Sequence, residues 1–94
     1  MFTGIVTDIG QVRHATRQGD IRARIGTGYD TGGIDIGASI ACDGVCLTVV
    51  ELGADWFDVE ISAETVSKTN IGADGWPEGR RLNLERALRV GDEL

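Results

Sequence analysis

Apolar and polar side chains alternate with a period of two along most of this chain. In residues 34–42, every even-numbered position is apolar and every odd-numbered position is small or polar. This alternation predicts a strand with one buried face. Similar alternation covers residues 2–9, 21–25, 45–52, 57–61 and 81–85, and a change of phase near Gly10 predicts a bulge. We therefore expect six short strands.

The dipeptide Asp43-Gly44 separates two of these segments, residues 34–42 and 45–52. Both residue types tolerate a positive φ, so the pair predicts a two-residue hairpin turn. A two-residue turn fixes the register, and the expected partners are Cys42 with Val45, Ala41 with Cys46, Ile40 with Leu47 and Ser39 with Thr48. One face of this hairpin is apolar and is expected to enter the core; it carries Ile40, Cys42, Val45, Leu47 and Val49.

The opposite face of the hairpin carries small side chains, namely Gly37, Ser39, Ala41, Cys46 and Thr48. Two interpretations are open at this point. The face is either a solvent or loop-packing surface that lacks charge, or a floor on which a flat ligand rests. In the second case the hydroxyl groups would orient the polar edges of the ligand.

Residues 62–68 break the alternation and predict a short helix. Ser62 is a good N-cap, and Glu64 lies in the first turn, where it can pair with Lys68. Asn70 or Gly72 is expected to end the helix. A helix this short is unstable alone, so it must pack against the strands.

These elements predict an all-β domain. The length of 94 residues fits one domain with a thin core, and 14 glycines against a single proline favour tight turns over long helices. Six antiparallel strands favour a closed barrel, because closure removes exposed strand edges. The short helix is then expected to close one end of that barrel.

The formal net charge of −6 excludes some classes of partner. A nucleic-acid backbone needs Lys and Arg to displace its counterions, and an anionic membrane surface attracts basic segments. No apolar run reaches the ~20 residues of a membrane span, and the first residues do not resemble a signal peptide. We therefore expect a cytoplasmic protein that binds neither nucleic acid nor membrane.

The chain offers few residues for metal binding or for a known catalytic motif. Two cysteines and one histidine are too few for a metal site, and reduced thiols are expected. A serine triad, a phosphate-binding loop and a complete dinucleotide fingerprint are all missing. Carboxylates such as Asp58, Glu60 and Glu64 are plentiful, and most of them are interpreted as solvated surface. The residue pattern alone thus predicts a small acidic β-barrel that binds a ligand.

Four segments resemble the riboflavin synthase family. They are MFTGIV at residues 1–6, GASIACDGVCLTV at 37–49, AETVSKTNIG at 63–72 and LNLERAL at 82–88. The resemblance implies a six-stranded antiparallel Greek-key barrel with a short helix. The family's full chain holds two lumazine-binding barrels in tandem. Residues 1–94 are expected to be the first of these repeats, without the second.

The resemblance also implies a reaction. In this family, one molecule of 6,7-dimethyl-8-ribityllumazine gives a four-carbon unit to another, which yields riboflavin and 5-amino-6-ribitylamino-pyrimidinedione. The enzyme is a transferase of riboflavin biosynthesis that uses no metal and no organic cofactor. It is a homotrimer in which an N-terminal barrel meets a C-terminal barrel of a neighbouring subunit. We expect the isolated barrel to bind lumazine or riboflavin, to form a homodimer and to lack turnover.

Matching the family's contacts to this chain, together with the small-residue face of the hairpin, gives a set of expected substrate-binding residues: Gly4, Ile5, Val6, Ser39, Cys46, Leu47, Thr48, Glu60, Ile61, Ser62, Ala63, Glu64 and Thr65. Glu64 and Thr65 are expected to hold ribityl hydroxyl groups. Cys46 and Ser39 are the candidates for a catalytic role, although a packing and contact role is favoured for Cys46 because no basic neighbour would lower the pKa of its thiol.

Two other classes of protein remain as alternatives. Non-catalytic lumazine or flavin carriers of the lumazine-protein type share the same barrel, and residues of a second barrel would distinguish them from the enzyme. A generic small barrel that binds a protein partner is the third interpretation. Absence of heterocycle binding would favour it.

Overall fold

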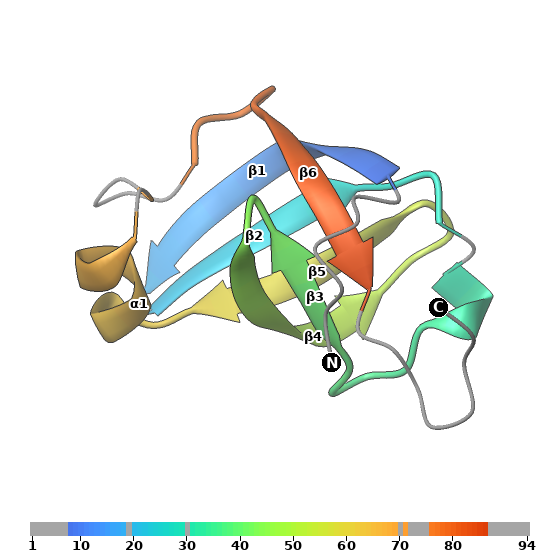
Figure 1. Ribbon diagram of the computed structural model, residues 1–94, viewed down its shortest axis with the longest axis horizontal. Coiled ribbons are helices and arrows are strands. Elements are labelled where there is room, and N and C mark those ends of the chain that lie inside the picture. Colours follow the sequence, from blue (N-terminus) through green and yellow to red (C-terminus); the bar gives the residue numbers. More distant parts are fainter. Residues whose placement is uncertain (1–7, 19, 30, 70, 72–75, 87–94) are drawn as a thin grey trace.

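The chain forms a closed antiparallel β-barrel (Figure 1). A computed structural model describes residues 8–18, 20–29, 31–69, 71 and 76–86. The strands are β1 (Asp8–Gln18), β2 (Asp20–Gly26), β3 (Ser39–Cys42), β4 (Val45–Leu52), β5 (Trp56–Ile61) and β6 (Arg81–Arg86). A 3-10 turn, η1 (Thr31–Gly33), precedes β3, and a short helix, α1 (Ala63–Lys68), follows β5. The order around the barrel is β1-β2-β5-β4-β3-β6, and β6 closes it by pairing with β1. The predicted fold class is confirmed.

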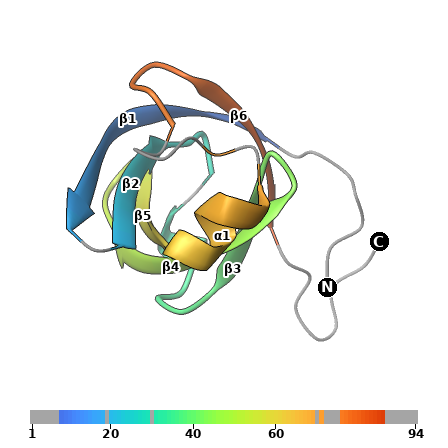
Figure 2. The same ribbon diagram turned by 90° about the vertical axis from the view of Figure 1, so that its left-hand side faces the viewer.

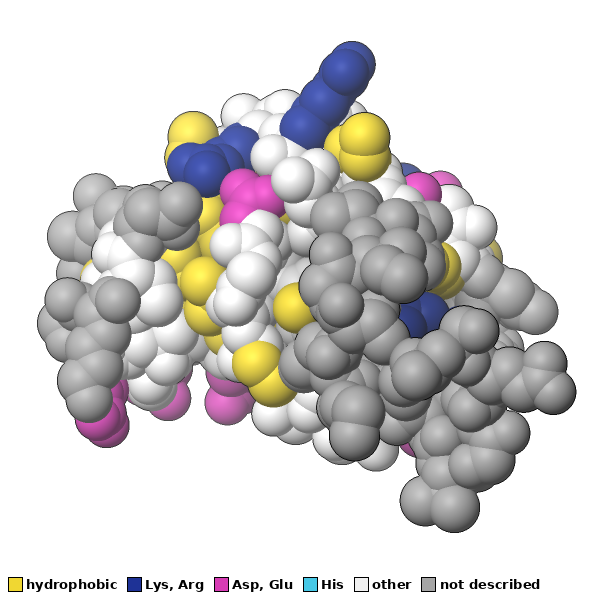
Figure 3. All heavy atoms as spheres, in the orientation of Figure 1, with side chains coloured by type: hydrophobic (Ala, Val, Ile, Leu, Met, Phe, Trp, Pro, Cys, Tyr) yellow, Lys and Arg dark blue, Asp and Glu magenta, His cyan; other side chains and the backbone are white. Residues whose placement is uncertain are grey.

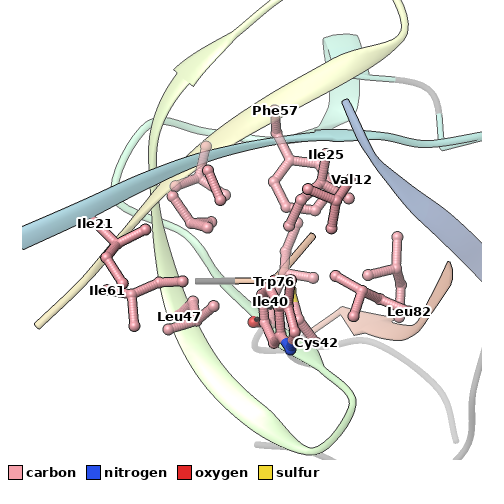
Figure 4. Packing of buried hydrophobic residues seen from close by; sticks show 14 of the residues in the cluster. Val12, Ile21, Ile25, Ile40, Cys42, Leu47, Phe57, Ile61, Trp76 and Leu82 are labelled. Atoms are coloured by element: carbon pink, nitrogen blue, oxygen red, sulfur yellow. Dashed lines mark hydrogen bonds between the residues drawn. The ribbon is translucent and has the colours of Figure 1, made fainter. Parts of the chain in front are cut away.

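Apolar side chains from all six strands fill the inside of the barrel (Figure 4). Each core residue is exposed by 4% or less, and the cluster consists of Val12, Ile21, Ala23, Ile25, Ile34, Ile40, Cys42, Leu47, Val49, Phe57, Val59, Ile61, Ile71, Trp76, Leu82 and Leu84. Every second residue of a strand points inward, so the alternating pattern of the sequence places these side chains in one core. Within the described ranges, no helix has the length and apolar character needed to span a membrane.

The helix α1 lies across one end of the barrel, as expected (Figure 2). Its Val66 packs against the core cluster, and the buried side chains of Ile71 and Trp76 join that cluster after the helix. Ser62 is the N-cap, and its hydroxyl oxygen accepts a hydrogen bond from the backbone N–H of Thr65 at 3.1 Å. The prediction of the cap is therefore confirmed.

The end of α1 differs from the prediction. Thr69, in extended conformation, is the C-cap, instead of Asn70 or Gly72. Its hydroxyl group donates to the Thr65 carbonyl oxygen at 2.8 Å. This carbonyl is one of the last in the helix and would otherwise lack a hydrogen-bond donor. The predicted pairing of Glu64 with Lys68 involves the Lys68 side chain, which lies outside the part of the chain that the structure describes.

The β3–β4 hairpin has the register predicted from its turn. Cys42 pairs with Val45, Ala41 with Cys46, Ile40 with Leu47 and Ser39 with Thr48. Asp43 and Gly44 have φ values of 50° and 82°, as a turn matched to the twist of the strands requires. The Asp43 carboxylate also accepts from the backbone N–H of Asn83 at 2.7 Å and from Arg80 at 3.1 Å, which fixes the turn against β6.

The strand expected over residues 34–42 is shorter than predicted. β3 begins only at Ser39, and Ile36, which the alternation placed on the buried face, is 61% exposed. Gly37 has a φ of 90°, which interrupts the extended backbone before β3. Ile34 is nevertheless buried, so a turn with alternating side chains imitates a strand in the sequence.

The first strand extends well beyond the predicted range of residues 2–9. β1 starts at Asp8, and residues 2–7 lie outside the described ranges. The register shift falls between Val12 and His14 instead of near Gly10. At Gly10 a Cβ atom would lie 2.7 Å from Leu84 Cδ1, so the glycine serves a close approach of strands and not a bulge.

Candidate functional site

Apolar side chains fill the inside of the barrel in the part of the chain that the structure describes, so the outer surface is the candidate for a ligand site. The core positions of the strands are closely packed with these side chains. Successive side chains of a strand point to opposite faces, so the residues between these core positions point outward. The hydroxyl and carboxyl groups predicted to contact a ligand are on this outer side.

Small and uncharged side chains cover the outer face of the β3–β4 hairpin. Cys46 and Thr48 on β4 are exposed, Ser39 on β3 is half-buried, and Ala41 is buried although it points outward. Figure 3 shows uncharged and apolar side chains over this hairpin, with acidic and basic ones near its turn. We call Ser39, Ala41, Cys46 and Thr48 the small-residue patch. It is a surface on which a flat ring can rest.

A polar row continues from this patch across the neighbouring strands. Thr48 pairs with Ser39 on one side and with Glu60 of β5 on the other. Glu60 in turn pairs with Arg22 of β2, and Arg22 pairs with Thr16 of β1. Directly opposite residues on one face have Cβ atoms about 4.5–5.5 Å apart. The row thus places hydroxyl groups, a carboxylate and a guanidinium along one line of the outer surface.

A hollow lies at the far end of this row. It has a volume of about 290 Å³ and is lined by Thr16, Asp20, Arg22 and Glu60. Glu60 is exposed, and among the described residues nothing forms a hydrogen bond or ion pair with its carboxylate. The Glu60 carboxylate therefore has all its acceptor positions available to a ligand.

Beside Glu60 on the outer face of β5, two arginines of β2 bind a buried carboxylate. Asp58 of β5 is only 2% exposed. Arg22 donates to its Oδ2 at 3.1 and 3.0 Å, while Arg24 donates to Oδ1 at 2.9 Å and to Oδ2 at 3.2 Å. Burial alone would raise the pKa of Asp58, but the hydrogen bonds from Arg24 and Arg22 outweigh burial and lower it. Asp58 is therefore an exception to the expectation that most carboxylates form solvated surface.

Further contacts keep this charged cluster in place. Arg22 also donates to Glu51 of β4 at 2.5 Å. The Arg24 guanidinium stacks on the Trp56 ring, 3.6 Å from its centroid. Gly53 leaves room for that ring, since a Cβ atom at this position would overlap with the ring.

The residues at the β5–α1 junction continue the site from Glu60. Ser62 and Glu64 are exposed and Thr65 is half-buried. The Ser62 and Thr65 hydroxyl groups are 2.9 Å apart and hydrogen-bonded to each other, so both are partly occupied by the helix cap. The backbone of Ala63 begins α1, and its side chain is outside the description.

Some of the predicted ligand-contacting residues point their side chains into the core, and others lie outside the described residues. Leu47 and Ile61 point into the core, where they are 4% and 0% exposed, so only their backbone groups can face a ligand. Gly4, Ile5 and Val6 precede the described residues.

The two cysteines differ completely in accessibility. Both are free; Cys46 is exposed on the patch, and Cys42 is buried in the core. Burial raises the pKa of the Cys42 thiol to about 12, so this thiol remains protonated and unreactive. Of the two, Cys46 alone is accessible for contact with a ligand.

The sequence pattern predicted neither the hollow nor the burial of Asp58. The alternation of Arg22 and Arg24 with apolar residues places both outside the barrel, and the same holds for Asp58 and Glu60. The sequence did contain one indication, because β2 carries two outward basic residues and β5 carries two outward acidic residues. Their pairing depends on the barrel topology, which places β2 beside β5 although the two strands lie far apart in the chain.

The chain is similar in sequence to riboflavin synthases. The chain is 49% identical over 100 residues to riboflavin synthase of Brucella abortus (strain 2308), and the match covers 100% of this chain and 48% of that protein. It is 41% identical over 96 residues to riboflavin synthase of Mycobacterium tuberculosis (strain ATCC 25618 / H37Rv), covering 100% and 47%. For riboflavin synthase of Saccharomyces cerevisiae (strain ATCC 204508 / S288c), the identity is 40% over 96 residues, covering 94% and 40%. The chain thus spans less than half the length of these relatives.

The model of one protein family, described as the lumazine binding domain, matches residues 3–87. This range includes all six strands, the helix α1 and the outer-face residues described above. The chain therefore belongs to the lumazine binding domain family.

Proposed function

We propose that this domain binds 6,7-dimethyl-8-ribityllumazine, or riboflavin, on the outer face of β3, β4 and β5. The observation that carries the proposal is the continuous row from the small-residue patch to the Glu60 carboxylate, which has no hydrogen bond or ion pair with any described residue. A flat heterocycle fits against small side chains, and its polar edges fit the hydroxyl groups of Ser39 and Thr48. The family membership supports the same ligand class.

The ribityl chain would extend from the ring toward the β5–α1 junction. Glu60 and Glu64 offer carboxylate acceptors there, and Ser62 and Thr65 offer hydroxyl groups. In the same proposal, Cys46 contacts the ring without reacting, while Leu47, Ile61 and Ala63 contribute backbone groups. Gly4, Ile5 and Val6 complete the set.

For the whole protein we propose the activity of its relatives, which are named riboflavin synthases. The reaction transfers a four-carbon unit between two bound lumazines and needs no metal or organic cofactor. Two stacked rings must be held in one geometry, and a misplacement of about 1 Å costs roughly 100-fold in rate. We therefore propose that the described barrel alone binds the ligand but turns it over very slowly or not at all.

We also propose how the protein assembles and where it is found. The isolated domain would form a two-fold homodimer, because identical chains most often associate in this way, whereas the full-length protein would be a homotrimer. Its proposed location is the cytoplasm, which cell fractionation would test. Sedimentation of the isolated domain would test the dimer, and a monomer at micromolar concentration would contradict it.

The experiment that tests binding is a titration with 6,7-dimethyl-8-ribityllumazine followed by the ligand's own fluorescence. A second readout uses Cys46, which should react with a thiol reagent in the free protein and become protected when the lumazine is bound. Cys42 is an internal control, since its thiol is buried and should stay unreactive in both states. Binding without protection of Cys46 would contradict the proposed surface, and absence of binding would contradict the function.

The same titration separates the enzyme from a carrier once the full-length protein is used. Appearance of riboflavin would identify the enzyme, and tight binding without riboflavin would identify a carrier of the lumazine-protein type. If the isolated domain produced riboflavin at the rate of the full-length enzyme, the proposal that a second barrel is needed would be wrong.

A further inference from the structure

Two carboxylates of β5, Asp58 and Glu60, lie near Arg22 of β2 but differ in burial and in hydrogen bonding. Asp58 is buried and receives two hydrogen bonds from Arg22. Glu60, two residues later, is exposed and receives no hydrogen bond from any described residue. Yet Glu60 is the residue directly opposite Arg22 in the β2–β5 ladder.

Cross-strand pairing alone would favour an ion pair between Arg22 and Glu60. Opposite charges facing each other on one side of a sheet attract, and their Cβ atoms lie about 4.5–5.5 Å apart. The Arg22 guanidinium instead leans along the sheet toward Asp58 and Glu51. The preference follows from burial, because a charged hydrogen bond to a buried carboxylate is screened less than one to an exposed carboxylate.

The consequence concerns the hollow between these side chains. Arg22 and Glu60 both line it, together with Thr16 and Asp20. If Arg22 paired with Glu60, the guanidinium would cover the carboxylate and fill part of the hollow. We propose that Asp58 is a positioning residue that holds Arg22 away from Glu60, so that the Glu60 carboxylate remains free to accept hydrogen bonds from hydroxyl groups of a ligand.

The chemistry of the hollow fits a ligand rich in hydroxyl groups. The carboxylates of Asp20 and Glu60 are pure acceptors, and the Thr16 hydroxyl group can both donate and accept. An anionic group would be repelled by the two carboxylates, whereas a neutral polyol chain donates to them. This inference rests on the proposed function, since the lumazine supplies such a chain.

The test is the lumazine affinity of three variants compared with wild type. Asp58→Asn removes the buried charge that holds Arg22, leaving only its exposed contact with Glu51. We expect roughly three- to tenfold weaker binding as Arg22 turns to Glu60, the value of about one hydrogen bond. The double variant Asp58→Asn with Arg22→Gln should recover most of that loss, because no guanidinium remains to cover Glu60. Asp55→Asn is the matched control: it breaks the exposed Arg13–Asp55 ion pair of the same barrel and should leave affinity unchanged.

Recovery in the double variant distinguishes positioning from a structural role. A purely structural role of Asp58 predicts that the second substitution adds damage or has no effect, and that result would overturn the inference. Unchanged affinity in a folded Asp58→Asn variant would overturn it as well.

A second pair of variants keeps the test decisive if Asp58→Asn does not fold. Arg22→Lys keeps the positive charge but loses the planar fork that binds Asp58, whereas Arg22→Gln loses the charge. We expect Arg22→Lys to bind lumazine less tightly than Arg22→Gln, because the lysine ammonium at position 22 is free to reach Glu60. Equal or tighter binding by Arg22→Lys would contradict the positioning role.

A crystal structure of a ligand-free variant separates this inference from the proposed function. In Asp58→Asn, or in Arg22→Lys if the former does not fold, the cation at position 22 should lie within about 4 Å of the Glu60 carboxylate. A cation that stays with Glu51 or with position 58 would overturn the inference. If this contact forms but wild type does not bind lumazine, the positioning holds and the proposed ligand is wrong.

Discussion

Replacing Gly44 by valine should destabilise the barrel through its backbone alone. Gly44 has a φ of 82° and is the second residue of the β3–β4 turn. A Cβ atom built there would have no other atom within 4 Å, so a new side chain meets no steric obstacle. The cost of the substitution is therefore the conformational cost of a positive φ in a residue with a Cβ.

That cost is about 1–2 kcal/mol for a residue other than glycine, and branching at Cβ places valine at the upper end. A domain of this size loses about 4–8 °C in melting temperature per kcal/mol. The expected decrease is therefore roughly 5–15 °C. The turn also fixes the register that puts Cys46 and Thr48 on the outer face, so its geometry matters for the site.

Thermal unfolding followed by calorimetry measures this decrease. Gly44→Asn is the control, because asparagine tolerates a positive φ far better than valine; it should lower the melting temperature much less. Equal melting temperatures for Gly44→Val and wild type would refute the turn described here. An equal decrease in the two variants would mean that something other than φ is responsible.

Three further predictions follow from single side chains. Thr48→Val should weaken lumazine binding by about 0.5–1.5 kcal/mol, the value of one hydrogen bond, in the fluorescence titration; unchanged affinity in a folded variant would remove Thr48 from the site. The pKa of Cys42 is raised to about 12 in the folded state, whereas the pKa of an unfolded cysteine is about 8.5. Denaturant titrations should therefore show that the free energy of unfolding falls as pH rises above about 9. A free energy of unfolding that stays constant at alkaline pH would contradict this. The pKa of Asp58 is lowered on folding, so its contribution is complete above its unfolded value of about 3.9 and is lost as pH falls through the lower folded value. Asp58→Asn should accordingly flatten the acid limb of stability, and an unchanged slope would show that other carboxylates determine it.

Much of this domain is readable from its sequence because the signals are local. The dipeptide Asp43-Gly44 specifies a turn, and a two-residue turn determines every pair in the β3–β4 ladder. Ser62 caps α1 through a bond to a residue three positions away. The period-two pattern correctly assigns Cys42 to the core and Cys46 to the outside.

The same pattern misleads where backbone conformation departs from an extended strand. Ile36 follows the alternation of residues 34–42 but is 61% exposed, because Gly37 turns the chain before β3 begins. In β1 the bulge lies beyond Val12, in a polar stretch with no apolar phase to reveal it. Apolar periodicity reports which side of a strand a residue occupies only if a strand is present.

The sequence by itself determined the positions of β2, β4, β5 and β6, the register of the β3–β4 hairpin and the direction in which most of their side chains point. Tertiary structure alone decided which outward carboxylate is buried and which is free. Asp58 and Glu60 have the same phase in β5, and no local property distinguishes them. Only the non-local pairing of β2 with β5 places Arg22 and Arg24 beside Asp58, while Glu60 stays exposed. The environment of a charged side chain depends on its neighbours across strands, and those neighbours come from distant parts of the chain.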